Sequence, residues 1–147
     1  MRCPQCPWAD TPHLAPVVAP QSVPEATVAL VGERYAHREV EENRPFAGES
    51  GEILRAACDA GRLDLSECHI TNAVGCAPPR SASSAQLTAA RKACKARLST
   101  ELGALERLKV LLPLGGAALA SCDVPGSILG RKNGQRGNNI ENHSLRE

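Results

Sequence analysis

The chain has 147 residues, of which 42% are apolar and 22% are charged, and its net charge is +1. This composition indicates one globular domain, and the near-neutral charge means that any nucleic-acid partner would have to bind a local basic face. No stretch is long and apolar enough for a signal peptide or a membrane span, so we expect a cytoplasmic protein.

The first half of the chain predicts one strand and one helix. Residues 1–25 are rich in proline and are expected to be irregular. Residues 26–32 form an apolar run that ends in glycine, which is typical of a buried strand. A charged loop is expected over 33–48, and then a helix over 49–61 with Ser50 as its cap.

The second half repeats this alternation. Strands are predicted over 67–74 and 108–115, with an amphipathic helix over 86–108 between them and another helix starting in 116–122. Alternating strands and helices favour an α/β fold, a three-layer α/β/α sandwich around a central parallel sheet.

The last fifteen residues differ from the rest of the chain. Four of the six asparagines lie in 133–147, and apolar residues are nearly absent there. We therefore expect a domain over 1–132 and a polar, disordered tail over 133–147.

The cysteines predict a metal site. Because an intracellular chain seldom carries a disulfide framework, some of the seven cysteines are expected to bind metal. A close pair and two distant single residues can enclose a 4Fe–4S cluster, and a structural zinc ion would use the same four ligands. The residues concerned are Cys3, Cys6, Cys76 and Cys94. Spacing alone does not choose between cluster, zinc and free thiols; the remaining cysteines, Cys58, Cys68 and Cys122, are expected in the core.

Four motifs occur in a specific order along the chain. They are VGE at 31–33, RPFAGESG at 44–51, ITNAVGCAPP at 70–79 and LLPLGGAALA at 111–120. Together with the cysteines, they resemble the iron–sulfur uracil-DNA glycosylases, the family-4 branch of that superfamily. The resemblance covers about residues 3–130.

The resemblance implies an enzyme that excises uracil from DNA, with a role for each matching residue. Phe46 would stack on the extruded base, a contact that contributes about 1–3 kcal/mol, and Asn72 would read the edge of the base. Glu39 would orient or activate the attacking water, and Gly32 and Glu33 would shape the floor of the pocket. Phe46 as an apolar plug, Asn72 as a turn residue and Glu39 as part of an acidic loop are the simpler alternatives.

The resemblance also implies a cofactor and a partner. Cys3, Cys6, Cys76 and Cys94 would ligate a structural 4Fe–4S cluster, and the chain would bind uracil-containing DNA as a monomer. Phosphate contacts are expected from Arg44, Arg80 and the segment GRKNGQRG, although these residues equally suit an ordinary solvated surface.

The chain departs from the family pattern at several places, which include Ala36 in place of a glycine and Val40 in place of an aspartate. Tyr35 replaces a proline and is expected to narrow the pocket, and Gly75 replaces a lysine before the cluster cysteine. The His-Pro motif that closes the family pattern is missing, because His143 has no proline after it. These departures predict a truncated member without the last strand; a catalytically impaired DNA-binding relative and a small zinc-binding interaction module are the alternatives.

Overall fold

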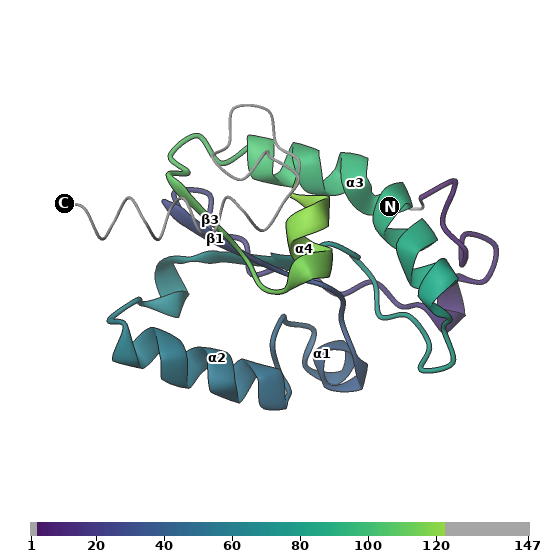
Figure 1. The fold of residues 1–147 in the computed structure, drawn as a ribbon, viewed down its shortest axis with the longest axis horizontal. Helices are drawn as coiled ribbons and strands as arrows, with labels where there is room; N and C mark the ends of the chain where they lie inside the picture. Colours follow the sequence, from purple (N-terminus) through teal and green to yellow (C-terminus); the bar gives the residue numbers. More distant parts are fainter. Residues whose placement is uncertain (1–2, 123–147) are drawn as a thin grey trace.

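A computed structural model describes residues 3–122, which form an α/β fold (Figure 1). Two single-turn 3₁₀ helices accompany four α-helices and three strands in this part of the chain. In chain order the elements are η1 (Pro12–Leu14), β1 (Val28–Gly32), α1 (His37–Glu42), α2 (Glu49–Ala60), η2 (Leu65–Glu67), β2 (His69–Asn72), α3 (Ser84–Gly103), β3 (Val110–Pro113) and α4 (Gly116–Ser121).

The three strands form a parallel sheet in the order β2-β1-β3. β1 lies in the middle, and its last residue, Gly32, is in register with the last residue of β2, Asn72. Helices α1 and α2 cover one face of the sheet, and α3 and α4 cover the other (Figure 1). The predicted three-layer sandwich is therefore confirmed for the part of the chain that the structure describes.

Strands β1 and β2 form because their side chains are buried on both faces of the sheet, whereas β3 leaves Val110 and Leu112 exposed. In β1, Ala29 and Val31 pack with Leu98 of α3, whereas Leu30 packs with Ile70 on the opposite face. An almost continuous apolar run is the pattern expected of a strand in a covered parallel sheet.

Helix α3 begins earlier than predicted because a reciprocal cap starts it. The hydroxyl of Ser83 accepts from the Gln86 amide at 3.2 Å, and the Gln86 side chain accepts from the Ser83 amide at 2.9 Å. This capping box sets the first turn at Ser84. The helix ends at Gly103, so Leu105, predicted to be helical, lies beyond it but still packs in the core.

Two local predictions for the first half are wrong. The segment 33–48 is not all loop, because it contains α1. Ser50 does not cap α2, since the helix starts at Glu49 after Gly48 and Ser50 lies inside its first turn. The side chain that serves this junction is Glu39, which accepts from the Gly48 amide at 3.3 Å.

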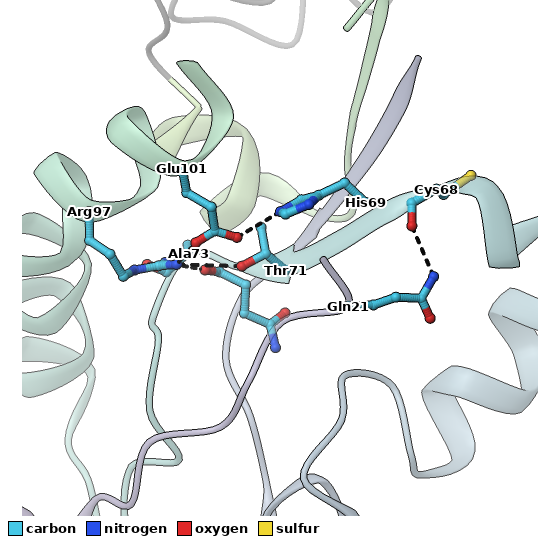
Figure 2. Close-up of polar contacts among 8 residues, drawn as sticks. Gln21, Cys68, His69, Thr71, Ala73, Arg97 and Glu101 are labelled. Atoms are coloured by element: carbon cyan, nitrogen blue, oxygen red, sulfur yellow. Dashed lines mark hydrogen bonds and ion pairs between the residues drawn. The ribbon is translucent and has the colours of Figure 1, made fainter. Parts of the chain in front are cut away.

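The irregular segment before β1 is fastened to β2. Gln21 and Ile70 exchange two backbone hydrogen bonds, of 2.9 and 3.0 Å, and the Gln21 side chain donates to the Cys68 carbonyl at 2.9 Å (Figure 2). Further toward the N-terminus, Val17 forms an isolated bridge with Cys76. These contacts bring the first cysteines to the end of β2.

The remaining predictions about the core hold where they can be examined. Cys58, Cys68 and Cys122 are buried as expected. Within residues 3–122, the chain contains no helix with the length and apolarity needed to cross a membrane. The predicted disordered tail, 133–147, lies outside the described residues, as does the basic segment GRKNGQRG.

Candidate active site

The amide of Asn72 and the ring of Phe46 converge above Gly32. A Cβ atom placed on Gly32 would lie 2.2 Å from Asn72 Oδ1 and 2.7 Å from Phe46 Cζ. Both distances are far shorter than a normal contact, so only glycine at this position leaves room for the two side chains. The two residues that the motifs single out are thus neighbours at the carboxyl edge of the sheet, where open α/β sheets bind ligands.

The loop that carries Phe46 is held in an uncommon conformation. Phe46 has φ of 52°, a left-handed value that non-glycine residues seldom adopt. Its carbonyl accepts from Arg55 Nη1 at 3.1 Å and packs directly on Gly51, whose Cβ would approach it to 1.8 Å. The ring is half-buried against the cluster that contains Leu30 and Ile70. It is therefore anchored in the core along one side, as the plug interpretation expects, while its edge reaches Asn72.

Glu39 orders the same loop. One carboxylate oxygen accepts from the amides of Ala47 at 3.0 Å and Gly48 at 3.3 Å, and the other accepts from the Ala36 amide at 3.1 Å. These three donors connect the start of α1 with the start of α2, and Phe46 lies directly before Ala47. Glu39 is thus built into the site and is not a free member of an acidic surface loop.

Glu33 directly follows Gly32, the last residue of β1. Its side chain is 41% exposed and accepts from Arg91 Nη1 of α3 at 3.3 Å, while its carbonyl accepts from the Val74 amide at 2.9 Å. This pair connects the first strand's end to α3 close to the candidate pocket.

The four cysteines predicted as ligands line one cavity of about 320 Å³. The cavity lies between the N-terminal segment and α3, and its wall also includes Trp8, which is only 6% exposed, and Arg97. The cysteines are Cys3, Cys6, Cys76 and Cys94. Residues far apart in the sequence are therefore brought to one cavity.

The thiols in this cavity influence one another. Burial, followed by the neighbouring thiols of Cys6, Cys94 and Cys3, raises the pKa of Cys76 to about 12. Burial and the adjacent Cys94 also raise the pKa of Cys3, and Arg97 acts in the opposite direction on both groups. Several thiolates in so small a space repel one another, so they would ionise together only with a cation between them.

The donor set consists of four thiols around a common cavity, which both iron–sulfur clusters and structural zinc ions can use. Within residues 3–122, no group of three or more His, Cys, Asp or Glu side chains is placed to hold a single metal ion, yet the four thiols surround a common cavity. A structural zinc site needs four ligands about 2.3 Å from one atom, whereas a 4Fe–4S cluster spreads its four thiolates over a larger volume.

Sequence reasoning missed a buried polar network between β2 and α3. Its members are His69, Thr71, Arg97 and Glu101, which lie together beside the end of β2 (Figure 2). Two signals in the sequence point to it: polar residues at alternate positions of a buried strand, and an Arg and a Glu four residues apart on the helix. Neither signal states which face of the helix the ion pair occupies.

Tyr35 lies in the core. The residue is 1% exposed and packs against Val18 and Ala77, with Val40 beside it. Burial raises the pKa of its phenol to about 12, against an opposing hydrogen bond with Thr71. The ring that replaces proline therefore fills the space between α1 and the sheet.

Of the residues expected to contact phosphate, Arg80 is exposed and Arg44 is paired. Arg80 lies with Pro79 and His37 along a surface cavity of about 410 Å³. Arg44 Nη2 forms an ion pair of 2.5 Å with Glu42, which neutralises part of its charge.

Residues 19–140 match the family model described as the uracil DNA glycosylase superfamily. The matched segment contains β1, β2 and β3 together with Gly32, Phe46 and Asn72, whereas Cys3 and Cys6 precede it. The chain belongs to the uracil DNA glycosylase superfamily, whose members act on DNA.

Proposed function

We propose that this member of the superfamily hydrolyses the N-glycosidic bond of uracil in DNA and leaves an abasic site. The observation that carries the proposal is the convergence of the Phe46 ring and the Asn72 amide above Gly32. A glycosylase has to turn the base out of the duplex, stack it on an apolar surface and read its edge. An aromatic ring beside a carboxamide at the carboxyl edge of the sheet supplies both contacts.

Uracil presents a carbonyl acceptor, O4, next to a donor, N3–H. A carboxamide offers a donor and an acceptor side by side, so the Asn72 side chain is complementary to this edge. Cytosine has an amino group at the corresponding position and would place donor against donor. A carboxamide turned by 180° would match cytosine instead, so the preference for uracil requires the orientation with Nδ2 toward O4 and Oδ1 toward N3–H, which we assign to Asn72. Phe46 adds binding energy that depends little on the identity of the base.

Hydrolysis needs a water molecule and stabilisation of the positive charge that develops on the sugar. We assign both roles to Glu39, a carboxylate on the Phe46 loop. Its oxygens already accept three backbone hydrogen bonds, which fix its orientation. A carboxylate has about four acceptor positions, so one remains for a water molecule.

The cavity lined by Cys3, Cys6, Cys76 and Cys94 would hold a 4Fe–4S cluster, as in the family-4 branch. When bound, such a cluster supplies structural cross-linking and no redox step in the hydrolysis. The protein's own contribution is to join the N-terminal segment to the end of β2 and to α3 through the four thiols. Zinc is the alternative occupant, and metal analysis of anaerobically purified protein separates the two, because only the cluster gives a brown chromophore.

The proposal is tested by measuring binding and uracil release together, with the enzyme in excess over single- and double-stranded DNA that contains one uracil. We expect release of free uracil and an abasic site, and a lower but still measurable rate of release in Asn72→Ala and Phe46→Ala. Lys92→Met is the matched control, because Lys92 is exposed on α3 and the change removes a surface charge. Binding without release would contradict the proposed hydrolysis and favour a catalytically impaired relative.

A further inference from the structure

The side chain of Arg97 donates hydrogen bonds to two consecutive backbone carbonyls, those of Asn72 and Ala73. Arg97 Nη2 donates to the Asn72 carbonyl at 2.5 Å and to the Ala73 carbonyl at 3.1 Å, and Nη1 lies 3.4 Å from Thr71 Oγ1 (Figure 2). The guanidinium thus clamps the end of β2, where the chain leaves the sheet. Fixing these carbonyls also fixes the direction in which the Asn72 side chain leaves the backbone.

A buried acid holds the guanidinium in this place. Glu101, one turn further along α3, pairs with Arg97 Nη1 and accepts from His69 Nε2 at 2.8 Å. Burial by itself would raise the pKa of Glu101, but the hydrogen bond from His69 and the charge of Arg97 outweigh it and lower the pKa. The carboxylate is therefore charged and bonded on both oxygens, which makes the clamp rigid.

The other side of the same guanidinium lines the cysteine cavity. Its Nε is buried and has no hydrogen-bond partner among the described residues. Gly75, next to Cys76, lies directly against the side chain: a Cβ on Gly75 would meet Arg97 Nε at 3.0 Å and Cδ at 3.2 Å. The glycine that replaces a lysine in this motif therefore makes room for Arg97.

We propose that Arg97 is a positioning residue that connects the cysteine cavity to Asn72, and that Gly75 admits it to this position. The proposal rests on the proposed function, because it assigns Asn72 to base recognition. If the four thiols hold a cluster or a zinc ion, they would be thiolates, and their negative charge would attract the guanidinium from one side. The carbonyls at residues 72 and 73 attract it from the other. Loss of the cation releases both ends.

A double-mutant cycle of Arg97→Met and Asn72→Ala tests the connection. Arg97→Met alone is expected to lower kcat/KM for uracil release by about 10–100-fold. In the Asn72→Ala background the same change should cost less than about threefold, because the residue through which Arg97 acts has already been removed. Multiplicative losses would overturn the proposal, since a residue that only stabilises the fold would add its cost in either background.

A second variant leaves every charge in place. Gly75→Ala crowds the guanidinium and is expected to reduce kcat/KM in the same direction as Arg97→Met, with no further loss when the two changes are combined. Lys92→Met, which removes a positive charge from the same helix, should match the wild type. A Gly75→Ala protein with wild-type kcat/KM would contradict the role given to Gly75.

The contact between Arg97 and the cysteine cavity is tested separately, by the rate at which the protein loses its metal. During a chelator challenge, Arg97→Met is expected to lose its metal about 10–100-fold faster than the wild type or Lys92→Met. Equal rates of metal loss would show that Arg97 does not support the cavity, and would overturn this half of the proposal.

These outcomes are distinguishable from a failure of the proposed function. If the wild-type chain binds uracil-containing DNA without releasing uracil, the double-mutant cycle of Arg97→Met and Asn72→Ala is measured as changes in the Kd for that DNA. If it does neither, the proposed function fails, and hydrogen exchange of the segment 70–76 decides about Arg97. Faster exchange of this segment in Arg97→Met than in Lys92→Met supports the clamp, and equal exchange refutes it.

Discussion

Replacing Gly32 with alanine perturbs the candidate site with a single methyl group. The new Cβ would lie 2.2 Å from Asn72 Oδ1 and 2.7 Å from Phe46 Cζ. Carbon atoms in contact prefer a separation of about 3.5–4.0 Å, so the ring would have to retreat by about 1 Å, and the amide by a similar distance. Both atoms belong to side chains, so the strand itself can remain in place.

The expected loss follows from that displacement. A misplacement of about 1 Å in a catalytic site can cost about 100-fold in rate, whereas overpacking costs about 1–3 kcal/mol of stability. Gly32→Ala should therefore lose about two orders of magnitude in single-turnover uracil release while the protein remains folded. Release is measured on a uracil-containing oligonucleotide, and folding by the thermal midpoint.

Gly103→Ala is the matched control for this variant. Gly103 is the last residue of α3, and a Cβ there meets nothing within 4 Å. The control should release uracil at the wild-type rate. A Gly32→Ala protein that also keeps the wild-type rate would refute the placement of the base above Gly32, because no pyrimidine could stack there without disturbance.

Three further predictions use single groups that can be observed separately. Tyr35 is the sole tyrosine, and burial raises its pKa to about 12, so the phenolate absorbance of the folded protein should appear near pH 12 and not near the ordinary value of 10.0. The contribution of the buried phenol to folding stability is complete below pH 10 and is lost as the pH rises through 12. Trp8 is the sole tryptophan and lines the cysteine cavity, so its fluorescence should be quenched by a bound iron–sulfur chromophore and recover when the cluster is removed, whereas a fluorescence unaffected by removal would contradict the assigned position of the cluster. Glu39→Gln keeps a side-chain acceptor for the loop and removes the negative charge, so it should lower the rate of uracil release at nearly unchanged DNA affinity; an unchanged rate would assign Glu39 to loop structure alone.

The sheet and the central pair of the site are predictable from the sequence for a simple reason. A buried strand in a parallel sheet is a short apolar run, and the runs that contain Val31 and Ile70 are bounded by Gly32 and Asn72. Parallel strands end at the same edge of the sheet, so Gly32 and Asn72 are neighbours once the two strands lie next to each other. The motif positions then placed Phe46 beside them.

Helix α1 was not predictable from hydrophobic periodicity, although its Arg and Glu residues favour a helix. The six residues His37–Glu42 include only one apolar side chain, so they show no periodicity. Glu39 instead bonds to the amides of Ala47 and Gly48, and Val40 packs near Tyr35. The helix depends on contacts with residues outside it, which a local pattern does not contain.

The buried ion pair was missed for a related reason. An Arg and a Glu four residues apart on a helix usually lie in solvent, where such a pair contributes about 0.3–0.5 kcal/mol. Here Arg97 and Glu101 are only 19% and 18% exposed, because the face of α3 that carries them lies against the end of β2. Partial burial raises the cost of removing one partner above that of a solvent-exposed pair, because the remaining charge is left where water reaches it poorly.

Two glycines explain how one small sheet edge accommodates both a base-reading amide and its support. At Gly32 the missing side chain lets Asn72 and Phe46 meet, and at Gly75 it lets Arg97 reach the backbone of Asn72 from the cysteine cavity. A side chain at either position would displace a neighbouring functional group while leaving the strands intact. Substitutions at Gly32 and Gly75 should therefore reduce function far more than they reduce stability, which is the opposite of what Ala29 or Leu98 in the core would show.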